Sequence, residues 1–421
     1  MRHRASPILG RVAPWAVLVA AFAVPLALAG EYRWLLAYLS QTAAMIVLAL
    51  SYNLLLGETG LLSFGHAVYS GLAAFVAAQA FNRYAIAVPI LPLVGGIAGA
   101  ALAVPFGFIA TRRAGTAFAM ITLGIGELAL AVVWAAPAGF GDAAGVVIDR
   151  AAGPAWGHWT FGPAREAYAV VAAWCLLACA TMAALVRTPF ARLANAVRDN
   201  ERRVAALGTD PRRVRYAMVV VSAFFAGVAG TLTLIDVEIA SSGGLSMARS
   251  GDVLIATVIG GSASFFGPAV GAVVLSGFSI GLASVTHAWP LYLGLIFVTI
   301  VLCAPDGIVG LVGRGLAAIG TLRAQGLRER LAAVRVALFG ALAWLAWLAA
   351  CVLAVETLYA RQFAVDAGAQ WHLGGYRFDA ASPMTWAAVG ALACVGALAA
   401  LRVRRARMRG QVGAACRGAR S

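Results

Sequence analysis

Long apolar stretches recur along the whole chain, and they limit its fold more than any other feature. Many are about 18 residues or longer, which at about 1.5 Å per residue is enough to cross a hydrocarbon core of about 30 Å. Lipid offers the backbone no hydrogen-bond partner, so stretches of this kind must be helices. A membrane β-barrel would alternate apolar and polar residues, and segments such as 341–355 do not. The sequence therefore predicts an all-α polytopic membrane protein.

The composition excludes a soluble fold of the same length. Of the 421 residues, 62% are hydrophobic and only 12% are charged. A soluble protein needs about 25% charged residues to cover its domains. This chain lacks that polar surface, so lipid must cover much of it.

Twelve apolar segments can be read along the chain. They are 12–29, 34–56, 61–82, 86–110, 116–137, 167–186, 216–238, 252–265, 268–286, 290–312, 336–358 and 384–401. The first is interpreted as an uncleaved span, although its end, Ala27-Leu28-Ala29, is similar to a signal-peptide cleavage site. The short, glycine-rich segments 252–265 and 268–286 are either two thin crossings or one re-entrant hairpin.

The arginines predict the orientation of these spans. All 32 basic residues are Arg, and with the N-terminus inside, 25 of them lie on the cytoplasmic side and 7 outside. Basic residues near span ends favour the cytoplasm, so both termini are predicted to lie there, in a bacterial inner membrane. Because the arginines lie beside apolar spans, the net charge of +15 indicates lipid headgroups as partners and not nucleic acid.

The motifs of enzymes are absent from the sequence. A Walker A phosphate loop needs a Lys, and the chain has none, so no ATPase site of that kind is expected. No His/Cys cluster has metal-ligand spacing, and no serine-hydrolase elbow or zinc-protease pair occurs. We therefore expect no catalytic residues, no metal and no cofactor in this chain.

The basic loop from Arg187 to Arg215 carries clear signs of a helix. Thr188-Pro189 predicts a capped helix start, and Gly208 a helix stop, before Asp210-Pro211 begins the next helix. Apolar residues recur between them at mostly helical spacing, which predicts one amphipathic helix over 189–207. Its exposed side would carry mixed charges. Such a helix is either a lipid-headgroup anchor or a docking element for a cytoplasmic partner, and the acidic side chains favour docking.

Several polar residues fall where lipid should be. Glu127 lies near the middle of the span 116–137, in a stretch that also contains Thr122, Gly124 and Gly126. A charged carboxylate at that depth costs about 2.5 kcal/mol or more unless it meets a partner or a cavity. Two interpretations stay open: a neutral Glu bonded to a neighbouring helix, or a role in the transport pathway or in coupling between helices.

Two further groups of residues interrupt the apolar pattern. Asn53 and His66 flank the turn 57–60, and His66 is expected to be a hydrogen-bonded buried residue more readily than a ligand. The broken region carries Gly260, Gly261, Gly267 and Pro268, which loosen a helix and remove a backbone donor. Breaks at membrane depth are tolerated where they line a cavity or are buried in protein, as in transporters, although loose packing alone also produces them. The acidic residues Asp236, Glu238 and Asp252 are expected at the outer mouth.

Four stretches together make the chain resemble a known family, the permease subunits of branched-chain amino acid ABC importers, of the LivM type and its LivH relatives. They are Tyr52-Asn53-Leu54 with Gly60 to His66; Thr122 to Glu127; Thr188 to Gly208 with Ser222 to Gly230; and Gly260-Gly261 to Gly267-Pro268 with Ala304 to Gly310. The third is the most specific, and together they cover about residues 34–313.

This resemblance implies a function and a set of partners. A permease of this type pairs with a second, homologous permease, two cytoplasmic ABC ATPases bind ATP and drive the pair, and an external binding protein delivers the substrate. The residues implied in ATPase coupling are Arg192, Arg198, Asp199, Asn200, Glu201, Leu207 and Gly208. Those implied in the pathway or in helix packing are Asn53, Ser63, Phe64, Gly65, His66, Thr122, Gly124, Gly126, Glu127, Gly260, Gly261, Gly267 and Pro268.

The chain departs from the family pattern in two places. The outer stretch 139–145 differs from the Thr-Gly-Gly pattern common in the family, which leaves a branched-chain amino acid, urea, a short amide or a small organic acid as substrate. Beyond a ten-segment permease core (1–313) we expect a basic cytoplasmic linker helix (314–335) and a two-helix extension with a basic tail (336–421). This extension is interpreted as a peripheral hairpin or as an assembly element.

Two other functions remain compatible with the sequence. An ion- or proton-coupled secondary transporter would use Glu127 as its coupling carboxylate. A membrane scaffold without transport would use none of these residues.

Overall fold

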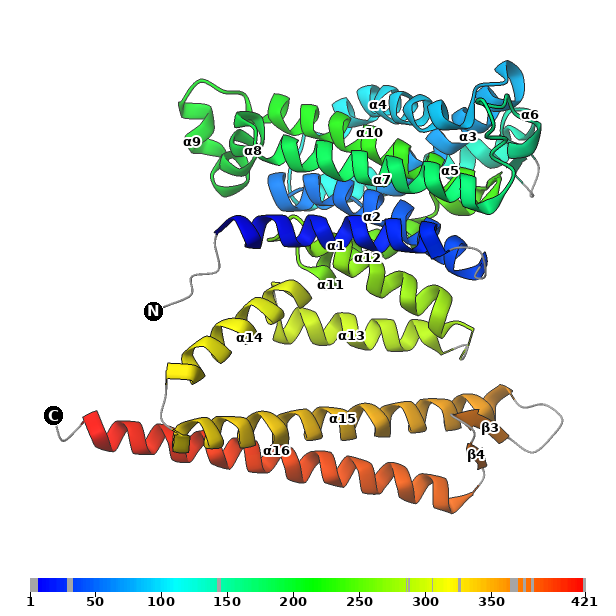
Figure 1. The fold of residues 1–421 in the computed structure, drawn as a ribbon. Helices are drawn as coiled ribbons and strands as arrows, with labels where there is room; N and C mark the ends of the chain where they lie inside the picture. The colour runs from blue at the N-terminus through cyan, green and yellow to red at the C-terminus, as the bar shows by residue number, and fades with distance from the viewer. Residues whose placement is uncertain are drawn as a thin grey trace. The chain divides into compact units, whose positions relative to one another are not determined.

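The computed structural model describes residues 7–28, 33–141, 145–284, 286, 288–304, 306–324, 327–363, 370–373, 376–379 and 382–418. These residues are mostly helical, and the apolar helices among them confirm an all-α polytopic membrane protein (Figure 1). The chain divides into two compact units. The first contains Met1–Val285 and Tyr292–Leu311, and the second contains Thr286–Leu291 and Val312–Ser421.

The first unit holds most of the helices. Its long helices are α1 (Pro7–Leu28), α2 (Arg33–Thr59), α3 (His66–Tyr84), α4 (Leu91–Ala110), α5 (Thr116–Ala135), α7 (Ala164–Val186), α10 (Pro211–Val237) and α13 (Trp289–Cys303). Its shorter helices are η1 (Val88–Ile90), α6 (Pro137–Phe140), η2 (Arg150–Ala152), α8 (Pro189–Asp199), α9 (Glu201–Ala206), η3 (Ser242–Leu245), α11 (Met247–Gly260), α12 (Gly267–Ser276) and the π-helical η4 (Gly277–Leu282). Two short strands, β1 (Val146–Val147) and β2 (Ile239–Ala240), pair antiparallel.

Helix α10 lies at the centre of this unit, packed against α2, α3 and α4. Glycines set how closely the helices approach. A Cβ added to Gly99 of α4 would lie 2.3 Å from the carbonyl oxygen of Ala223, and one added to Gly230 of α10 would lie 1.9 Å from that of Ser70. Lipid tails are as apolar as the side chains, so small residues and close backbone packing hold such helices together.

Seven helices within the described residues are long and apolar enough to cross a membrane, or eight if one bent pair counts as a span. They are Trp34–Thr59, Val88–Ala110, Thr116–Ala135, Ala164–Val186, Pro211–Val237, Leu338–Tyr359 and Pro383–Arg402, with the pair Trp289–Leu302 and Gly307–Gly315. Shorter apolar helices cover Trp15–Leu26 and Gly267–Leu282. The predicted twelve segments and ten-segment core stay a prediction.

The structure corrects the extent of three predicted segments. The segment 61–82 becomes helical only at His66. The segment 290–312 is broken where Gly307 has φ +70, outside the range of a right-handed helix. The segment 252–265 ends as a helix at Gly260, so α11 has 14 residues and packs against α12 as a hairpin. Neither helix reaches the roughly 20 residues of a full crossing, which agrees better with a re-entrant hairpin.

The second unit contains a pair of long helices, α15 (Leu327–Phe363) and α16 (Pro383–Gly418). Between them, β3 (Gln370–Leu373) and β4 (Tyr376–Asp379) pair antiparallel, with Gln370 opposite Asp379. The expected linker helix 314–335 is not a separate element, because its described residues end α14 (Gly307–Ala324) and begin α15. The functions assigned to the three predicted domains stay predictions.

Candidate functional site

The loop between α7 and α10 forms two helices, α8 and α9, where the sequence predicted one helix over 189–207. The predicted start is confirmed, because the Thr188 side chain caps the first turn of α8. Asn200 interrupts the helix with φ −158 and ψ 94, and its side chain accepts a hydrogen bond from the backbone N–H of Arg203 at 3.0 Å. Asn favours an N-cap over a helix interior, so it ends α8 and begins α9.

The predicted end of this loop is also confirmed. Gly208 has φ +86, which glycine adopts without steric cost, and Asp210 caps α10 through the backbone N–H of Arg212 at 2.9 Å. Leu207 is 79% exposed, which is unusual for a large apolar side chain. The charged and polar residues expected on the surface are exposed, namely Arg198, Asp199, Asn200, Glu201 and Arg202, and Arg192 is exposed as well.

Helix α8 is bonded to the end of α2. The guanidinium of Arg198 donates to the carbonyl of Gly57, and its aliphatic stem lies over Gly60, where an added Cβ would be 2.9 Å from Arg198 Cγ. Asn195 donates to the Glu58 carboxylate at 2.5 Å. Part of the predicted partner surface therefore holds α8 on the chain's own helices. The contact between Asn195 and Glu58 could not be predicted from the sequence pattern.

Helix α9 is bonded to α10 by one ion pair. The Arg215 guanidinium donates two hydrogen bonds to the Glu201 carboxylate, at 2.8 and 3.0 Å. The Arg215 side chain is 5% exposed, whereas that of Glu201 is 49% exposed. Any displacement of α8 and α9 would thus act directly on α2 and α10.

His66 belongs to a buried polar layer between α2, α3 and α10. Its Nε2 lies 2.9 Å from Ser51 Oγ, and its ring meets the edges of Tyr52 and Tyr69. Ser222 of α10 donates to the carbonyl of Ser51 at 2.6 Å. His66 is fully buried, so the structure agrees with the hydrogen-bonded interpretation. Asn53, two residues after Ser51 on α2, is also buried.

The predicted residues of the α2–α3 turn meet α5 at Thr122. The Thr122 hydroxyl accepts a hydrogen bond from the backbone N–H of Phe64 at 3.2 Å. A Cβ added to Gly65 would lie only 2.1 Å from the Thr122 carbonyl oxygen. The backbone N–H of Ser63 donates to the Tyr52 hydroxyl at 3.3 Å. These contacts show close helix packing. A Cβ added to Gly126 of α5 would lie 3.7 Å from the Cα of Gly65.

Glu127 lies on a different face of α5. It is exposed, as is Gly124, and it forms no hydrogen bond or ion pair with any residue that the structure describes. Within the described residues no helix of this chain supplies a bond to Glu127, and both interpretations of this residue stay predictions. A carboxylate on the outside of an apolar helix needs water or another subunit as its neighbour.

The four predicted helix-breaking residues form a close backbone crossing. A Cβ added to Gly267 would lie 1.9 Å from the carbonyl oxygen of Gly261, and one added to Gly260 would lie 1.8 Å from that of Gly267. Gly261 has φ +104 and approaches the carbonyl of Asp306. Pro268 stands in the first turn of α12. The α11–α12 turn is thus packed on the break between α13 and α14.

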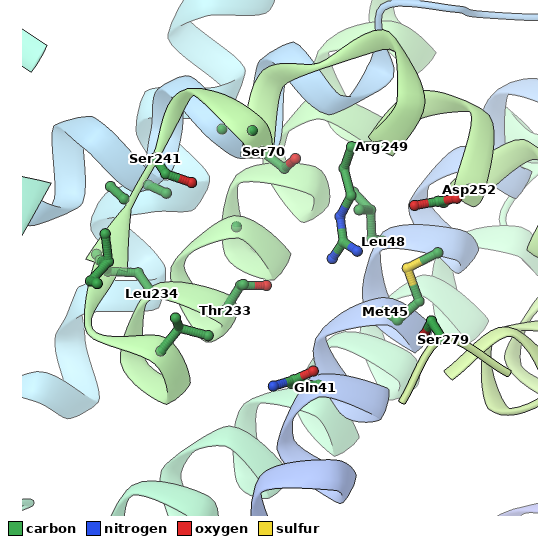
Figure 2. Close-up of a pocket in the computed structure, with 18 of the residues that line it drawn as sticks. Gln41, Met45, Leu48, Ser70, Thr233, Leu234, Ser241, Arg249, Asp252 and Ser279 are labelled. Atoms are coloured by element: carbon green, nitrogen blue, oxygen red, sulfur yellow. The ribbon is translucent and has the colours of Figure 1, made fainter. Parts of the chain in front are cut away.

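A cavity of about 340 Å³ lies among α2, α3, α10, α11 and α12 (Figure 2). We call it the Arg249 cavity, after the guanidinium that reaches into it. Its lining includes polar groups from six helices and from the segment between β2 and η3, namely Gln41, Ser70, Thr233, Ser241, Arg249, Asp252, Ser276 and Ser279. Sequence reasoning expected Asp252 at a water-filled mouth but missed Arg249, which it used only as an orientation marker. Within the described residues, no three His, Cys, Asp or Glu side chains gather as metal ligands.

Comparisons with known proteins cover most of the first unit. Residues 34–304 match the family described as branched-chain amino acid transport system / permease component. The high-affinity branched-chain amino acid transport system permease protein LivM of Escherichia coli K12 is 26% identical over 291 residues, covering 64% of this chain and 68% of that protein. LivM of Salmonella typhimurium LT2 is 27% identical over 294 residues, with the same coverage. No solved structure matches the chain.

Proposed function

Because the chain belongs to the family of permease components of branched-chain amino acid transport systems, we propose that it forms the substrate pathway of an ABC importer for branched-chain amino acids. The family match over residues 34–304 carries this proposal, and it confirms the resemblance to LivM-type permeases. Such a permease is a multi-pass membrane component that works with other transport subunits.

The proposed partners are two cytoplasmic ATPases, which bind ATP, a second homologous permease, and an external substrate-binding protein. The exposed surface of α8 and α9 would receive an ATPase. Leu207 offers it an apolar anchor among charged side chains. The bonds from Arg198 to α2 and from Glu201 to α10 support this, because they would carry a displacement of the loop into the membrane helices.

The exposed Glu127 supports pairing with a second permease. No described residue of this chain neutralises it, and lipid is an unfavourable neighbour for a carboxylate. A subunit interface or a water-filled path along α5 would supply the missing neighbour. The same residue is what a proton-coupled carrier would need, so the experiment must separate the two mechanisms.

The proposed orientation places both termini and the α8–α9 loop in the cytoplasm of a bacterial inner membrane. It rests on the 25 arginines of that side against 7 of the other. The Arg249 cavity then lies in the outer half of the protein, near the end of α10.

Reconstituted uptake tests the proposal. The chain is co-purified with the permease and ATPases encoded beside it, and uptake of labelled L-leucine delivered by the binding protein is measured in proteoliposomes. We expect uptake that needs ATP and stops when the Walker A Lys of the ATPases is replaced. Uptake that persists without ATP and follows a proton gradient would establish the secondary transporter. No uptake under any condition would favour the membrane scaffold without transport.

Two matched variants examine the coupling surface in the same assay. Leu207→Asn is expected to reduce uptake at least about fivefold, because an apolar anchor in an interface contributes more than about 1 kcal/mol. Val147→Asn replaces another exposed apolar residue, 56% exposed, in strand β1, and should leave uptake unchanged. Equal effects of the two variants would argue against ATPase docking at Leu207.

A further inference from the structure

Arg249 and Asp252 bring opposite charges into one cavity without joining each other. They lie one turn apart on α11, and both side chains line the Arg249 cavity (Figure 2). Neither forms a side-chain hydrogen bond or an ion pair with any residue that the structure describes. The two charges interact electrostatically but share no hydrogen bond, so the cavity presents a positive and a negative group whose hydrogen-bonding atoms are open to a ligand.

The first turn of α11 holds both side chains toward this cavity. Ser246 caps the helix by accepting a hydrogen bond from the backbone N–H of Arg249 at 3.2 Å. Ser250, fully buried between them, accepts one from the backbone N–H of Ala67 in α3 at 3.1 Å. These two bonds fix the rotation of α11 about its axis, so the side chains on either side of Ser250 are positioned before any ligand arrives.

The guanidinium defines the first requirement on a ligand. Arg stays charged at all accessible pH values, and a charge held away from bulk water is costly unless a partner neutralises it. Its planar fork matches a carboxylate with two parallel hydrogen bonds, which are short and strong. The carboxylate of Asp252 sets the second requirement in the same way, since it accepts hydrogen bonds from a cation.

The remaining lining is mixed. Apolar side chains of Met45, Leu48, Leu234, Leu275 and Ile280 form part of the wall, with hydroxyl groups of Ser70 and Thr233 between them. The volume of about 340 Å³ falls within the range of small-molecule sites, roughly 300–1,000 Å³. A molecule that satisfies the whole cavity carries one carboxylate, one ammonium and an apolar body.

We propose that the Arg249 cavity binds neutral amino acids as zwitterions, with Arg249 holding the α-carboxylate and Asp252 the α-ammonium. The inference rests on the proposed transport function and specifies its substrate class. Urea and short amides would leave both charges unmatched, and small organic acids would leave Asp252 unmatched. Acidic and basic amino acids would bring a third charge against an apolar wall.

Protection from thiol labelling measures binding to the chain alone. Val237 lines the cavity and is 46% exposed, so Val237→Cys in a background without the native cysteines places an accessible thiol at its rim. The full chain in lipid nanodiscs is treated with a charged methanethiosulfonate reagent while L-leucine, leucinamide or 4-methylpentanoate is titrated. We expect protection by L-leucine, and weaker protection by the analogues that lack the carboxylate or the ammonium.

Charge-specific variants test each contact. Arg249→Gln should weaken protection by L-leucine about 30-fold or more and remove its advantage over leucinamide, because the α-carboxylate of the ligand loses its charged partner. Asp252→Asn should weaken protection by L-leucine and remove the advantage of L-leucine over 4-methylpentanoate. Arg165→Gln, which replaces an exposed arginine in the first turn of α7, is the control and should change nothing. Arg249→Lys keeps the charge and should retain part of the binding.

The outcomes separate this inference from the proposed function. Failure of L-leucine to protect the thiol, while the complete transporter still imports leucine, would overturn the cavity assignment and leave the transport function standing. Equal protection by all three probes would overturn it as well. Protection with the expected charge dependence, but no ATP-driven uptake, would instead support the binding site and refute the transport function.

Discussion

The pair formed by Glu201 and Arg215 allows the attachment of α9 to be measured. Glu201→Gln keeps the size of the side chain but removes the charge that neutralises Arg215. The Arg215 side chain is only 5% exposed, and within the described residues its Nε has no hydrogen-bond partner, so the guanidinium depends on this carboxylate. The substitution should let α9 detach from α10 more often without unfolding the membrane helices.

The size of the effect follows from the burial of each partner. Removing one partner of a fully buried pair costs about 3–5 kcal/mol, whereas an exposed pair is worth about 0–1 kcal/mol. The Glu201 side chain is 49% exposed, so water can partly take its place beside Arg215. This places the free-energy cost of Glu201→Gln at about 1–3 kcal/mol. Local opening would become about 5- to 150-fold more frequent.

Hydrogen exchange of the α9 amides reads this opening directly. The amides of residues 204–207 should exchange faster by the same factor in Glu201→Gln. Arg213→Gln is the matched control, because the Arg213 side chain is 89% exposed and its Nε lies 3.6 Å from Asp210 Oδ2 at the start of α10. If both variants exchange alike, or if Glu201→Gln and Arg215→Gln add independently in a double-mutant cycle, the ion pair does not hold α9.

Three other substitutions follow from single contacts. Gly65→Ala should abolish folded protein in size-exclusion profiles, because its Cβ would lie 2.1 Å from a backbone carbonyl of α5, whereas Gly124→Ala, with no atom within 4 Å, should behave as wild type. Ser51→Ala should destabilise the protein by about 1–3 kcal/mol, since it leaves His66 Nε2 without its partner, and an unchanged melting temperature in detergent would contradict this. Gly208→Ala should cost about 1–2 kcal/mol because φ is +86, and unchanged exchange of the neighbouring amides would show that the turn adapts.

Much of the loop between α7 and α10 could be predicted because its determinants are local. Thr188 caps α8, Gly208 ends α9, and Asp210 caps α10, as the residue types and their spacing indicate. A cap needs only a side chain and a backbone N–H two or three residues away. The break at Asn200 was missed because its residue type fits both a helix surface and an N-cap, and apolar spacing continues across it.

The contacts of the charged residues could not be predicted in the same way. Arg198 and Glu201 were expected to face a partner, and they also bind Gly57 of α2 and Arg215 of α10. Arg198 and Gly57 are 141 residues apart, so their meeting depends on how α2 and α8 pack. The exposure of Glu127 could likewise not be predicted, because the residue pattern of an apolar helix does not show which side faces its neighbours.

The sequence by itself determined the helical membrane fold, the helix caps and the arginine bias, because each follows from transfer to lipid or from bonds between near neighbours. The tertiary structure decided which polar groups share one space. Gln41, Ser70, Thr233 and Arg249 come from four separate elements, and the Arg249 cavity exists only once α10 has packed against α2 and α3. The bond from α3 to Ser250 fixes the rotation of α11, which directs Arg249 into this cavity as a candidate ligand-binding residue.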